Sequence, residues 1–305
     1  MDFELIASGL DFPEGPIAMA DGSVVLVEIR RGTLSRVAPD GRIDVIAALG
    51  GGPNGAAIGP DGQVYVCNNG GFKWIELPGG YLSPHGTSES WTGGAIQRVD
   101  LQTGRFETLY EACDGVRLRG PNDLVFDAHG GFYFTDLGKQ VDDYRYLGAV
   151  YYARADGSGI VRARYPMQTP NGIGLSPDGR SLCVAESLTG RIWAYEIEAP
   201  GQLRPPPDLL PGRLLATLPD YQLPDSLAVQ ADGKMCVATL VRGGINLIDP
   251  RDGSVVYIDV PDERFVTNLC FGGADLRDAW ITCSGRGRLM KCRWPSPGLQ
   301  LAFNG

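Results

Sequence analysis

Six segments of the sequence place an oxygen-bearing side chain, Glu, Asn or Asp, at the start of an apolar run. In five of the six segments a proline comes directly before that side chain, and in the sixth a threonine takes its place. The segments are Pro13-Glu14-Gly15, Pro53-Asn54-Gly55, Pro121-Asn122-Asp123, Pro170-Asn171-Gly172, Pro224-Asp225-Ser226 and Thr267-Asn268-Leu269. Such a repeat indicates several copies of one structural unit, each presenting one oxygen donor.

The oxygen-bearing residues of these segments, called the first set below, are two carboxylates and four amides, without a thiolate or an imidazole. Donor sets made only of oxygen suit Ca²⁺, Mg²⁺ or Mn²⁺. We therefore expect one divalent metal ion, with calcium as the first choice and magnesium, manganese or zinc as alternatives. The competing interpretation is that Asn and Asp begin strands because their side chains bond nearby backbone. The repetition of the pattern at one position favours the metal site.

A second polar position follows each member of the first set. In most copies a turn such as Pro60-Asp61-Gly62 separates two apolar runs, which is the pattern of a β-hairpin. Both ends of a hairpin lie together, so residues about fourteen positions later should lie at the same end of the molecule. These residues, called the second set, are Glu28, Asn68, Asp136, Glu186, Thr239 and Cys283.

Two members of the second set are candidate functional residues. We predict Asp136 as an acid, a base or a partner for a substrate hydroxyl, and Glu28 as a substrate contact. The alternative is that each is a solvated carboxylate at the end of a strand.

Two long segments, residues 70–93 and 137–147, follow the second strand of their repeats. We therefore expect them to project from the same end of the molecule as the first set. The first segment carries Phe72, Trp74, Tyr81, His85 and Trp91. A long aromatic loop beside a polar ring is a candidate lid or wall for a substrate. We predict Trp74 and His85 as substrate contacts. The alternative is that the aromatic side chains pack only against their own loop.

The repeat predicts the fold. It runs from Phe12 to Ile281 and leaves no stretch for a second fold, so we expect residues 1–305 to form a single domain. Repeated hairpins with 43 glycines and 22 prolines suit an all-β, six-bladed β-propeller with four antiparallel strands per blade. Residues 2–9 read as an additional strand. We expect this strand to complete the last blade by pairing near residues 288–291, which closes the ring and hides an edge.

Composition excludes several classes of protein. A net charge of −9 works against a nucleic-acid partner, because phosphate binding needs clustered Lys and Arg. No apolar run approaches the length of a membrane span, and the N-terminus lacks the features of a secretion signal. We therefore expect a cytoplasmic protein without a membrane partner. The seven cysteines form no Cys-x-x-Cys pair, which favours buried free thiols over disulfides or a zinc site.

Two common catalytic arrangements lack support in the sequence. The only histidines are His85 and His129, and no Gly-x-Ser-x-Gly motif occurs, so a Ser-His-Asp triad is not indicated. The glycine clusters do not open helices, which argues against a dinucleotide-binding loop.

The chain resembles the regucalcin and gluconolactonase family of six-bladed propellers over nearly its whole length. The motifs that carry the resemblance are Pro13-Glu14-Gly15-Pro16, Pro121-Asn122-Asp123-Leu124, Pro170-Asn171-Gly172, Pro224-Asp225-Ser226 and Thr267-Asn268-Leu269. The resemblance implies that Glu14, Asn171 and Asp225 bind one divalent metal at the top of the channel. It also implies that Asn122 is a further ligand or a substrate contact.

By the same resemblance, the metal would polarise the carbonyl of a lactone, and Asp225 would be the base that activates a water. We therefore expect a metal-dependent lactonase acting on a small sugar lactone, with Asn54 and Asn268 as further substrate contacts. Two alternatives stay open. The same metal propeller could act on another ester, a phosphotriester or a non-sugar lactone, or it could bind a metal or ligand without catalysis.

The chain departs from the family pattern at a few positions. Relatives often have Asp where this chain has Glu28 and Glu186, and Gly where it has Ser226. Some animal members place an arginine where Gly120 stands. These changes leave the implied metal ligands in place, but they remove the basis for naming a particular sugar.

Overall fold

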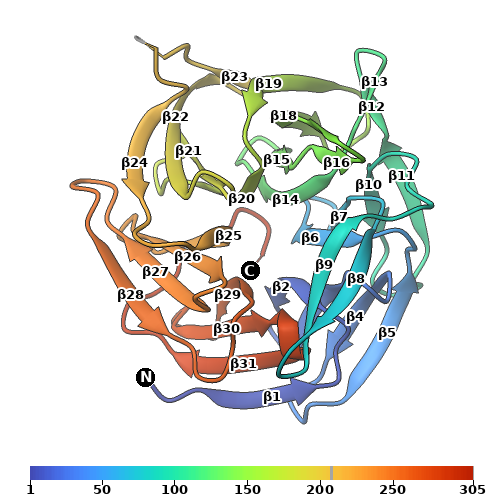
Figure 1. Ribbon diagram of the computed structural model, residues 1–305, viewed down its shortest axis with the longest axis vertical. Coiled ribbons are helices and arrows are strands. Elements are labelled where there is room, and N and C mark those ends of the chain that lie inside the picture. The colour runs from blue at the N-terminus through green and yellow to red at the C-terminus, as the bar shows by residue number, and fades with distance from the viewer. Residues whose placement is uncertain (207–208, 305) are drawn as a thin grey trace.

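The computed structural model describes residues 1–206 and 209–304. Within these residues the chain forms six antiparallel sheets arranged as blades around a central channel (Figure 1). The six-bladed β-propeller predicted from the repeat is therefore confirmed. Among the described residues the only helical element is the short 3₁₀ turn η1 (Ser284–Arg286).

Blades 1 to 3 each contain four strands, ordered from the channel outward. Blade 1 consists of β2 (Pro13–Ala18), β3 (Val24–Glu28), β4 (Thr33–Val37) and β5 (Ile43–Ala48). Blade 2 consists of β6 (Pro53–Ile58), β7 (Val64–Asn68), β10 (Ala95–Val99) and β11 (Phe106–Tyr110). Blade 3 consists of β14 (Pro121–Phe126), β15 (Gly131–Asp136), β18 (Gly148–Arg154) and β19 (Ile160–Met167).

Blades 4 to 6 follow the same plan, except that blade 4 gains a two-residue fifth strand, β23. Blade 4 consists of β20 (Pro170–Leu175), β21 (Ser181–Glu186), β22 (Arg191–Ala199), β23 (Gln202–Leu203) and β24 (Arg213–Thr217). Blade 5 consists of β25 (Leu223–Val229), β26 (Met235–Leu240), β27 (Gly244–Ile248) and β28 (Val255–Asp259). Blade 6 consists of β29 (Val266–Gly272), β30 (Asp278–Cys283), β31 (Arg288–Arg293) and β1 (Glu4–Ser8).

Three small hairpins stand outside the blades. They are β8 (Phe72–Leu77) with β9 (Tyr81–Thr87), β12 (Ala112–Cys113) with β13 (Val116–Arg117), and β16 (Lys139–Val141) with β17 (Tyr144–Tyr146). The segments 70–93 and 137–147, which the sequence predicts as loops, thus each contain a two-stranded sheet.

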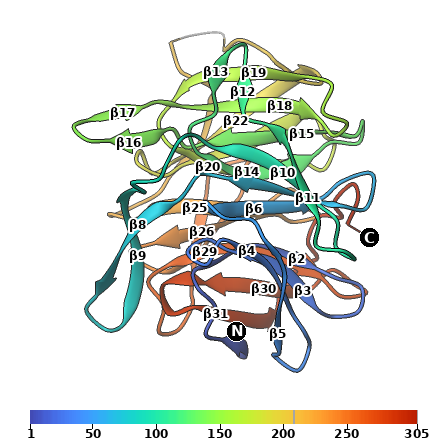
Figure 2. The same ribbon diagram turned by 90° about the vertical axis from the view of Figure 1, so that its right-hand side faces the viewer.

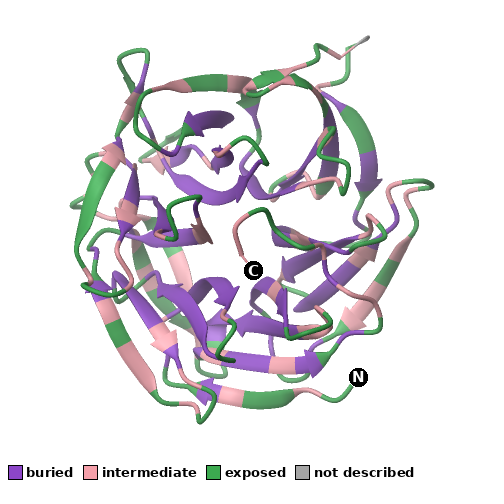
Figure 3. Ribbon diagram, turned by 180° about the vertical axis from the view of Figure 1, so that it is seen from behind, coloured by how far each residue is buried: buried purple, intermediate pink, exposed green. Residues whose placement is uncertain are grey.

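The strands next to the channel are apolar because other blades cover both of their faces. Every residue of β3, Val24-Val25-Leu26-Val27-Glu28, is buried, whereas in the outer strand β5 only Ala47 is buried and the other residues are partly or fully exposed. A strand that is covered on both faces reads as a continuous apolar run. The buried interior and the mixed outer rim are visible in Figure 3.

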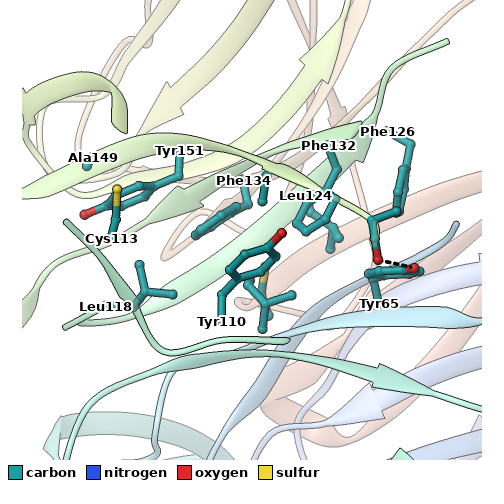
Figure 4. Close-up of a cluster of buried hydrophobic side chains, with 14 residues drawn as sticks. Tyr65, Tyr110, Cys113, Leu118, Leu124, Phe126, Phe132, Phe134, Ala149 and Tyr151 are labelled. Atoms are coloured by element: carbon teal, nitrogen blue, oxygen red, sulfur yellow. Dashed lines mark hydrogen bonds between the residues drawn. The ribbon is translucent and has the colours of Figure 1, made fainter. Parts of the chain in front are cut away.

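The core consists of seams between neighbouring blades. Side chains of β3 alternate between the two seams on either side of it, because successive residues of a strand point to opposite faces. Val25 and Val27 pack toward blade 2, whereas Val24 and Leu26 pack toward blade 6. Figure 4 shows the aromatic seam between blades 2 and 3, where Tyr65 meets Phe132.

The N-terminal strand closes the ring as predicted. Strand β1 pairs antiparallel with β31, with Glu4 opposite Lys291 and Ser8 opposite Arg288. All seven cysteines are free, as expected from their spacing. None of the described residues forms a helix with the length and apolar character of a membrane span.

The propeller has two unlike faces, which Figure 2 shows edge-on. The innermost strands begin at one face, called the upper face below, and the hairpins β8–β9 and β16–β17 project there. The C-terminal tail, residues 295–304, lies at the opposite face (Figure 2). In that tail the Leu299 N–H donates to the carbonyl of Val229 at 2.8 Å, and the Phe303 ring packs edge-on against Phe126.

Candidate active site

The side chains of the first set lie near the starts of the six innermost strands and are all buried. At this point the pairing of each innermost strand with its neighbour shifts register, for example between Glu14 and Ile17 in β2. Such bulges turn side chains away from the regular sheet direction, and they are common beside active sites. The proline that precedes most members of the set supplies no N–H to the ladder. The structure thus brings the first set together at the upper mouth of the channel.

Glycines next to the first set let neighbouring blades approach closely. A Cβ on Gly172 would lie 2.6 Å from the carbonyl oxygen of Asp225 and from the Leu227 nitrogen. One on Gly15 would lie 2.7 Å from the carbonyl oxygen of Asn54, and one on Gly55 would lie 2.5 Å from that of Asn122. A side chain cannot be accommodated at such distances. Glycine at these positions therefore allows neighbouring innermost strands to approach closely, which keeps the ring of oxygen donors small in diameter.

Three carboxylates are buried together at the mouth. The Glu14 carboxylate accepts from the Gly15 N–H at 2.6 Å and from Asn268 Nδ2 at 2.8 Å. Burial raises the pKa of Glu14 well above its usual range, and the charges of Asp225 and Asp123 add to this effect. Burial also raises the pKa of Asp225 to about 8 and that of Asp123 to about 7. Three acidic groups that disfavour one another's negative charge form a place where a cation would be stabilised.

Two amide oxygens of the first set have no hydrogen-bond partner among the described residues. Asn122 Oδ1 and Asn171 Oδ1 are both fully buried and unpaired. The Asn171 amide is oriented by its nitrogen, which donates to the Ser187 hydroxyl at 3.2 Å, and that hydroxyl donates in turn to the carbonyl of Pro224 at 2.7 Å. Unpaired buried acceptors are uncommon in folded proteins, and a bound ion or a water would satisfy both of these oxygens.

A divalent metal that prefers oxygen fits this arrangement. The carboxylates of Glu14 and Asp225 supply charge, and the free oxygens of Asn122 and Asn171 supply neutral donors. Within the described part of the chain, no three His, Cys, Asp or Glu side chains group as metal ligands. A metal at this mouth would therefore depend on the amides as well as the carboxylates.

Four members of the second set, Glu28, Asn68, Asp136 and Glu186, accept hydrogen bonds from the segment that precedes an innermost strand. Asp136 accepts the backbone N–H groups of Arg119 at 2.7 Å and of Gly120 and Gly138 at 2.8 Å. Glu28 accepts the N–H of Asp11 at 2.7 Å and also bonds side chains of its own blade. Equivalent bonds join Asn68 to Gly52 and Glu186 to Gln168. The structure does not bring Asp136 or Glu28 into contact with the first set, and their roles toward a substrate stay predictions.

The hairpin β8–β9 leaves blade 2 and packs against loops of other blades beside the mouth. The Trp74 ring lies 5.0 Å from that of Phe12, which comes two residues before Glu14. The Tyr81 ring lies 6.2 Å from that of Phe265, in the loop before β29. Phe12 and Phe265 also face each other at 6.5 Å. These four rings, called the aromatic wall below, border one side of the mouth.

The two predicted contacts of this hairpin differ in position. Trp74 is half-buried in the aromatic wall, whereas His85 is exposed on β9. The alternative that the loop aromatics pack only against one another is wrong, because Trp74 and Tyr81 reach other blades. Whether Trp74 and His85 contact a substrate stays a prediction.

The sequence reasoning assigned no role to Asp123 or Lys139. Asp123 follows Asn122 at a position where three other copies have glycine, and this departure from the repeat was the one signal in the sequence. Lys139 opens β16 and is 3% exposed. A lysine in a polar segment gives no sign of burial, so no sequence signal existed for it.

Below the first set, the channel encloses a cavity of about 360 Å³. Its walls are apolar residues of the innermost strands, including Ile17, Leu124, Ile173 and Leu227, and Asp123 lies at its upper end. Residues 299–304 of the C-terminal tail line its lower end. The site at the upper mouth is therefore separated from the lower face by this cavity and the tail.

The fold and the oxygen-lined mouth define a six-bladed propeller with a candidate metal site at one end of its channel. The family described as "SMP-30/Gluconolactonase/LRE-like region" matches residues 12–285. The chain belongs to this family, which confirms the resemblance found in the motifs.

Similar proteins of this kind are known from several bacteria. The chain is 25% identical over 297 residues to a gluconolactonase from Zymomonas mobilis, covering 88% of this chain and 75% of that protein. The structure of a gluconolactonase from Xanthomonas campestris superposes with a TM-score of 0.74 at 24% identity, covering 96% and 89% of the two chains. A calcium-binding regucalcin from Agrobacterium tumefaciens superposes with a TM-score of 0.68 at 17% identity, covering 96% and 95%.

Proposed function

We propose that this protein is a metal-dependent lactonase that hydrolyses a sugar lactone to the open-chain hydroxy acid. The observation that carries the proposal is that buried carboxylates and amide oxygens without hydrogen-bond partners occur together at one mouth of the channel. Membership of a family that includes gluconolactonases supports the same reaction.

Glu14, Asn171 and Asp225 would hold the divalent cation, with Asn122 as a fourth ligand or a substrate contact. Calcium is our first choice, since these ligands are carboxylates and amides, and a structural neighbour is described as a calcium-binding protein. When bound, such a cation supplies Lewis-acid polarisation of the lactone carbonyl. Mg²⁺, Mn²⁺ and Zn²⁺ are the alternatives.

Asp225 is the proposed general base. Its carboxylate takes a proton from a water whose oxygen attacks the carbonyl carbon of the lactone. The ring C–O bond then breaks, and the proton held by Asp225 passes to the departing ring oxygen, which becomes the hydroxyl of the product. Burial raises the pKa of the Asp225 carboxyl above its usual range, and a cation bound beside it would lower that pKa again, so that the carboxylate form is available as the base.

The remaining members of the first set position the reacting groups. Asn268 fixes the Glu14 carboxylate through its 2.8 Å hydrogen bond, and Asn54 faces the same mouth from blade 2. We propose Asn54 and Asn122 as hydrogen-bond partners for substrate hydroxyls. The aromatic wall excludes water from one side of the mouth.

The aromatic wall favours a second substrate class for the same chemistry. Phe12, Trp74, Tyr81 and Phe265 offer an apolar surface beside the first set. A sugar lactone has hydroxyls on most carbons, whereas an aryl or alicyclic lactone would bury its apolar face there. The second candidate is therefore a non-sugar lactone.

One experiment tests both candidates. The protein is stripped of metal with a chelator, restored with Ca²⁺, Mg²⁺, Mn²⁺ or Zn²⁺ in turn, and assayed against aldonolactones and aryl lactones. Hydrolysis that disappears on stripping and returns with one metal supports the proposal, and the preferred lactone decides between the two substrate classes. Stripped protein that keeps full activity would refute metal dependence, and metal binding without turnover of any lactone would indicate a binding protein.

A further inference from the structure

Lys139 is buried at the junction between the hairpins β16–β17 and β8–β9. Its ammonium nitrogen donates to the backbone carbonyl of Asn69 at 2.8 Å and to Asn69 Oδ1 at 3.2 Å. The same nitrogen lies 4.2 Å from the centre of the Phe72 ring. Asn69 directly follows β7, and Phe72 begins β8. The Lys139 side chain, which follows the second strand of blade 3 in the sequence, therefore holds the start of hairpin β8–β9, which follows the second strand of blade 2 and lies beside the mouth.

The other strand of hairpin β8–β9 is attached to the same part of blade 3. The Thr87 hydroxyl, at the end of β9, donates to the carbonyl of Gln140. Because Gln140 is the residue after Lys139, consecutive residues of β16 hold both strands of hairpin β8–β9 at its base. The two hairpins thus form one unit on the upper face.

Beyond its base, hairpin β8–β9 reaches the entrance of the candidate active site through two rings, that of Trp74 and, next to the turn, that of Tyr81. Trp74 and Tyr81 pack on Phe12 and Phe265, in the loops that lead into β2 and β29. Those strands carry Glu14 and Asn268. A shift at the base of the hairpin would therefore move the aromatic wall relative to the first set.

Burial of this ammonium group is costly, and no ion pair of Lys139 within the described residues offsets it. Asp136 is the charged group whose field reaches Lys139. The oxygens of Asp136, however, accept backbone N–H groups of Arg119, Gly120 and Gly138 instead of the ammonium. The other groups that touch the nitrogen, Asn69 and Phe72, are neutral. An amino group kept buried in such surroundings indicates a requirement for its hydrogen-bond donors rather than for packing alone.

We infer that Lys139 is a positioning residue that anchors hairpin β8–β9 and so fixes the aromatic wall beside the mouth. It does not touch the reacting atoms. Its effect on catalysis rests on the proposed lactonase function, whereas the anchoring of the hairpin does not. A methionine at this position would fill similar volume but would lack the hydrogen-bond donors and the cation that faces Phe72.

The test compares Lys139→Met with Lys73→Met. Lys73 lies next to Phe72 on the same strand, but its side chain is 51% exposed and pairs with Glu89 at the surface. Hydrogen exchange of the amides in β8 and β9 is measured by mass spectrometry for both variants. We expect Lys139→Met to exchange these amides about tenfold faster, as for the loss of one or two hydrogen bonds, and Lys73→Met to match the wild type.

Kinetics on a hydrolysed lactone supply a second readout. A displaced wall should raise KM several-fold and change kcat less, because the wall binds the substrate and takes no part in bond making. The variant Phe72→Leu removes the ring and leaves the ammonium bonds to Asn69, so it provides the same comparison if Lys139→Met does not fold. It should accelerate exchange in β8.

The outcomes separate the two ideas. If Lys139→Met exchanges the amides of β8 and β9 faster but the wild type hydrolyses no lactone, the anchoring role of Lys139 is supported and the proposed function is refuted. Unchanged exchange in β8 and β9, in folded Lys139→Met or, if that variant does not fold, in Phe72→Leu, would overturn the inference whether or not lactones are hydrolysed.

Discussion

Replacing Lys139 by methionine should change how the free energy of unfolding depends on pH. Burial lowers the pKa of Lys139 from 10.5 to about 7. Between these two values the unfolded chain holds a proton that the folded protein has lost, so the stability of the wild type rises with pH in this window. Below about pH 7 the side chain is charged in both states, and its contribution no longer changes with pH.

The magnitude follows from the width of the window. One pH unit corresponds to about 1.4 kcal/mol for a single titrating group. The folded side chain is already half deprotonated at about pH 7, so the full slope develops only above that pH. Between pH 7 and about pH 9, stability should therefore rise by about 2 kcal/mol in the wild type relative to Lys139→Met, which has no group to titrate.

Urea denaturation of both proteins at several pH values measures this difference. Subtracting the two curves removes the titration of every other group, and Lys73→Met serves as the control for losing an exposed lysine. If the difference between wild type and Lys139→Met stays constant from pH 7 to about pH 9, the ammonium is not buried in the folded protein, and the reasoning fails.

Three further predictions concern the candidate active site. Asp225→Asn should lower turnover by about 10² to 10⁴ at saturating metal, as for the loss of a general base. The lower turnover of Asn171→Ala, by contrast, should be largely recovered by excess metal. If excess metal also restores the turnover of Asp225→Asn, Asp225 is a metal ligand and not the base. Shortening residues 70–93 to a tight turn should change the ratio of activities across lactones and leave metal affinity, measured by titration calorimetry, nearly unchanged; constant ratios would contradict a role in substrate choice. Gly172→Ala places a Cβ 2.6 Å from backbone atoms of blade 5 and should weaken metal binding and lower the melting temperature, whereas Gly159→Ala, whose Cβ would have its nearest neighbour 4.0 Å away, should do neither; equal behaviour of the two variants would show that the close approach does not matter.

The architecture could be predicted because the repeat consists of residue types that strongly favour particular local backbone conformations. Proline before an oxygen side chain, and Asp-Gly turns between apolar runs, mark the start and the middle of each blade. The pairing of residues 2–9 with the last blade followed from ring closure, and the pairing of Glu4 with Lys291 confirms it. The strand starts and the turns depend on neighbours in the sequence, which is why they were visible there, and the closed ring then left the last blade as the partner of residues 2–9.

The candidate site was only partly predictable. The first set could be found because its members share one repeat position, but the buried charge of Asp123 depends on how three blades meet. Likewise, the counting that located Asp136 at a strand end could not reveal that its oxygens would be taken by backbone N–H groups of its own blade. Contacts between blades depend on tertiary packing, and repeat spacing does not encode them.

The way in which strand β1 completes blade 6 also has a consequence for how the chain is made. Glu4 is added to the growing chain roughly 290 residues before its partner Lys291. At about 5 to 20 residues per second, the first strand waits on the order of 15 to 60 s without the strand it pairs with. During that time blades 1 to 5 can form in succession, whereas blade 6 and the ring itself must wait until β31 has been made. A nascent chain stalled before β31 would therefore expose two unpaired strand edges, and these are the surfaces that a chaperone would have to cover.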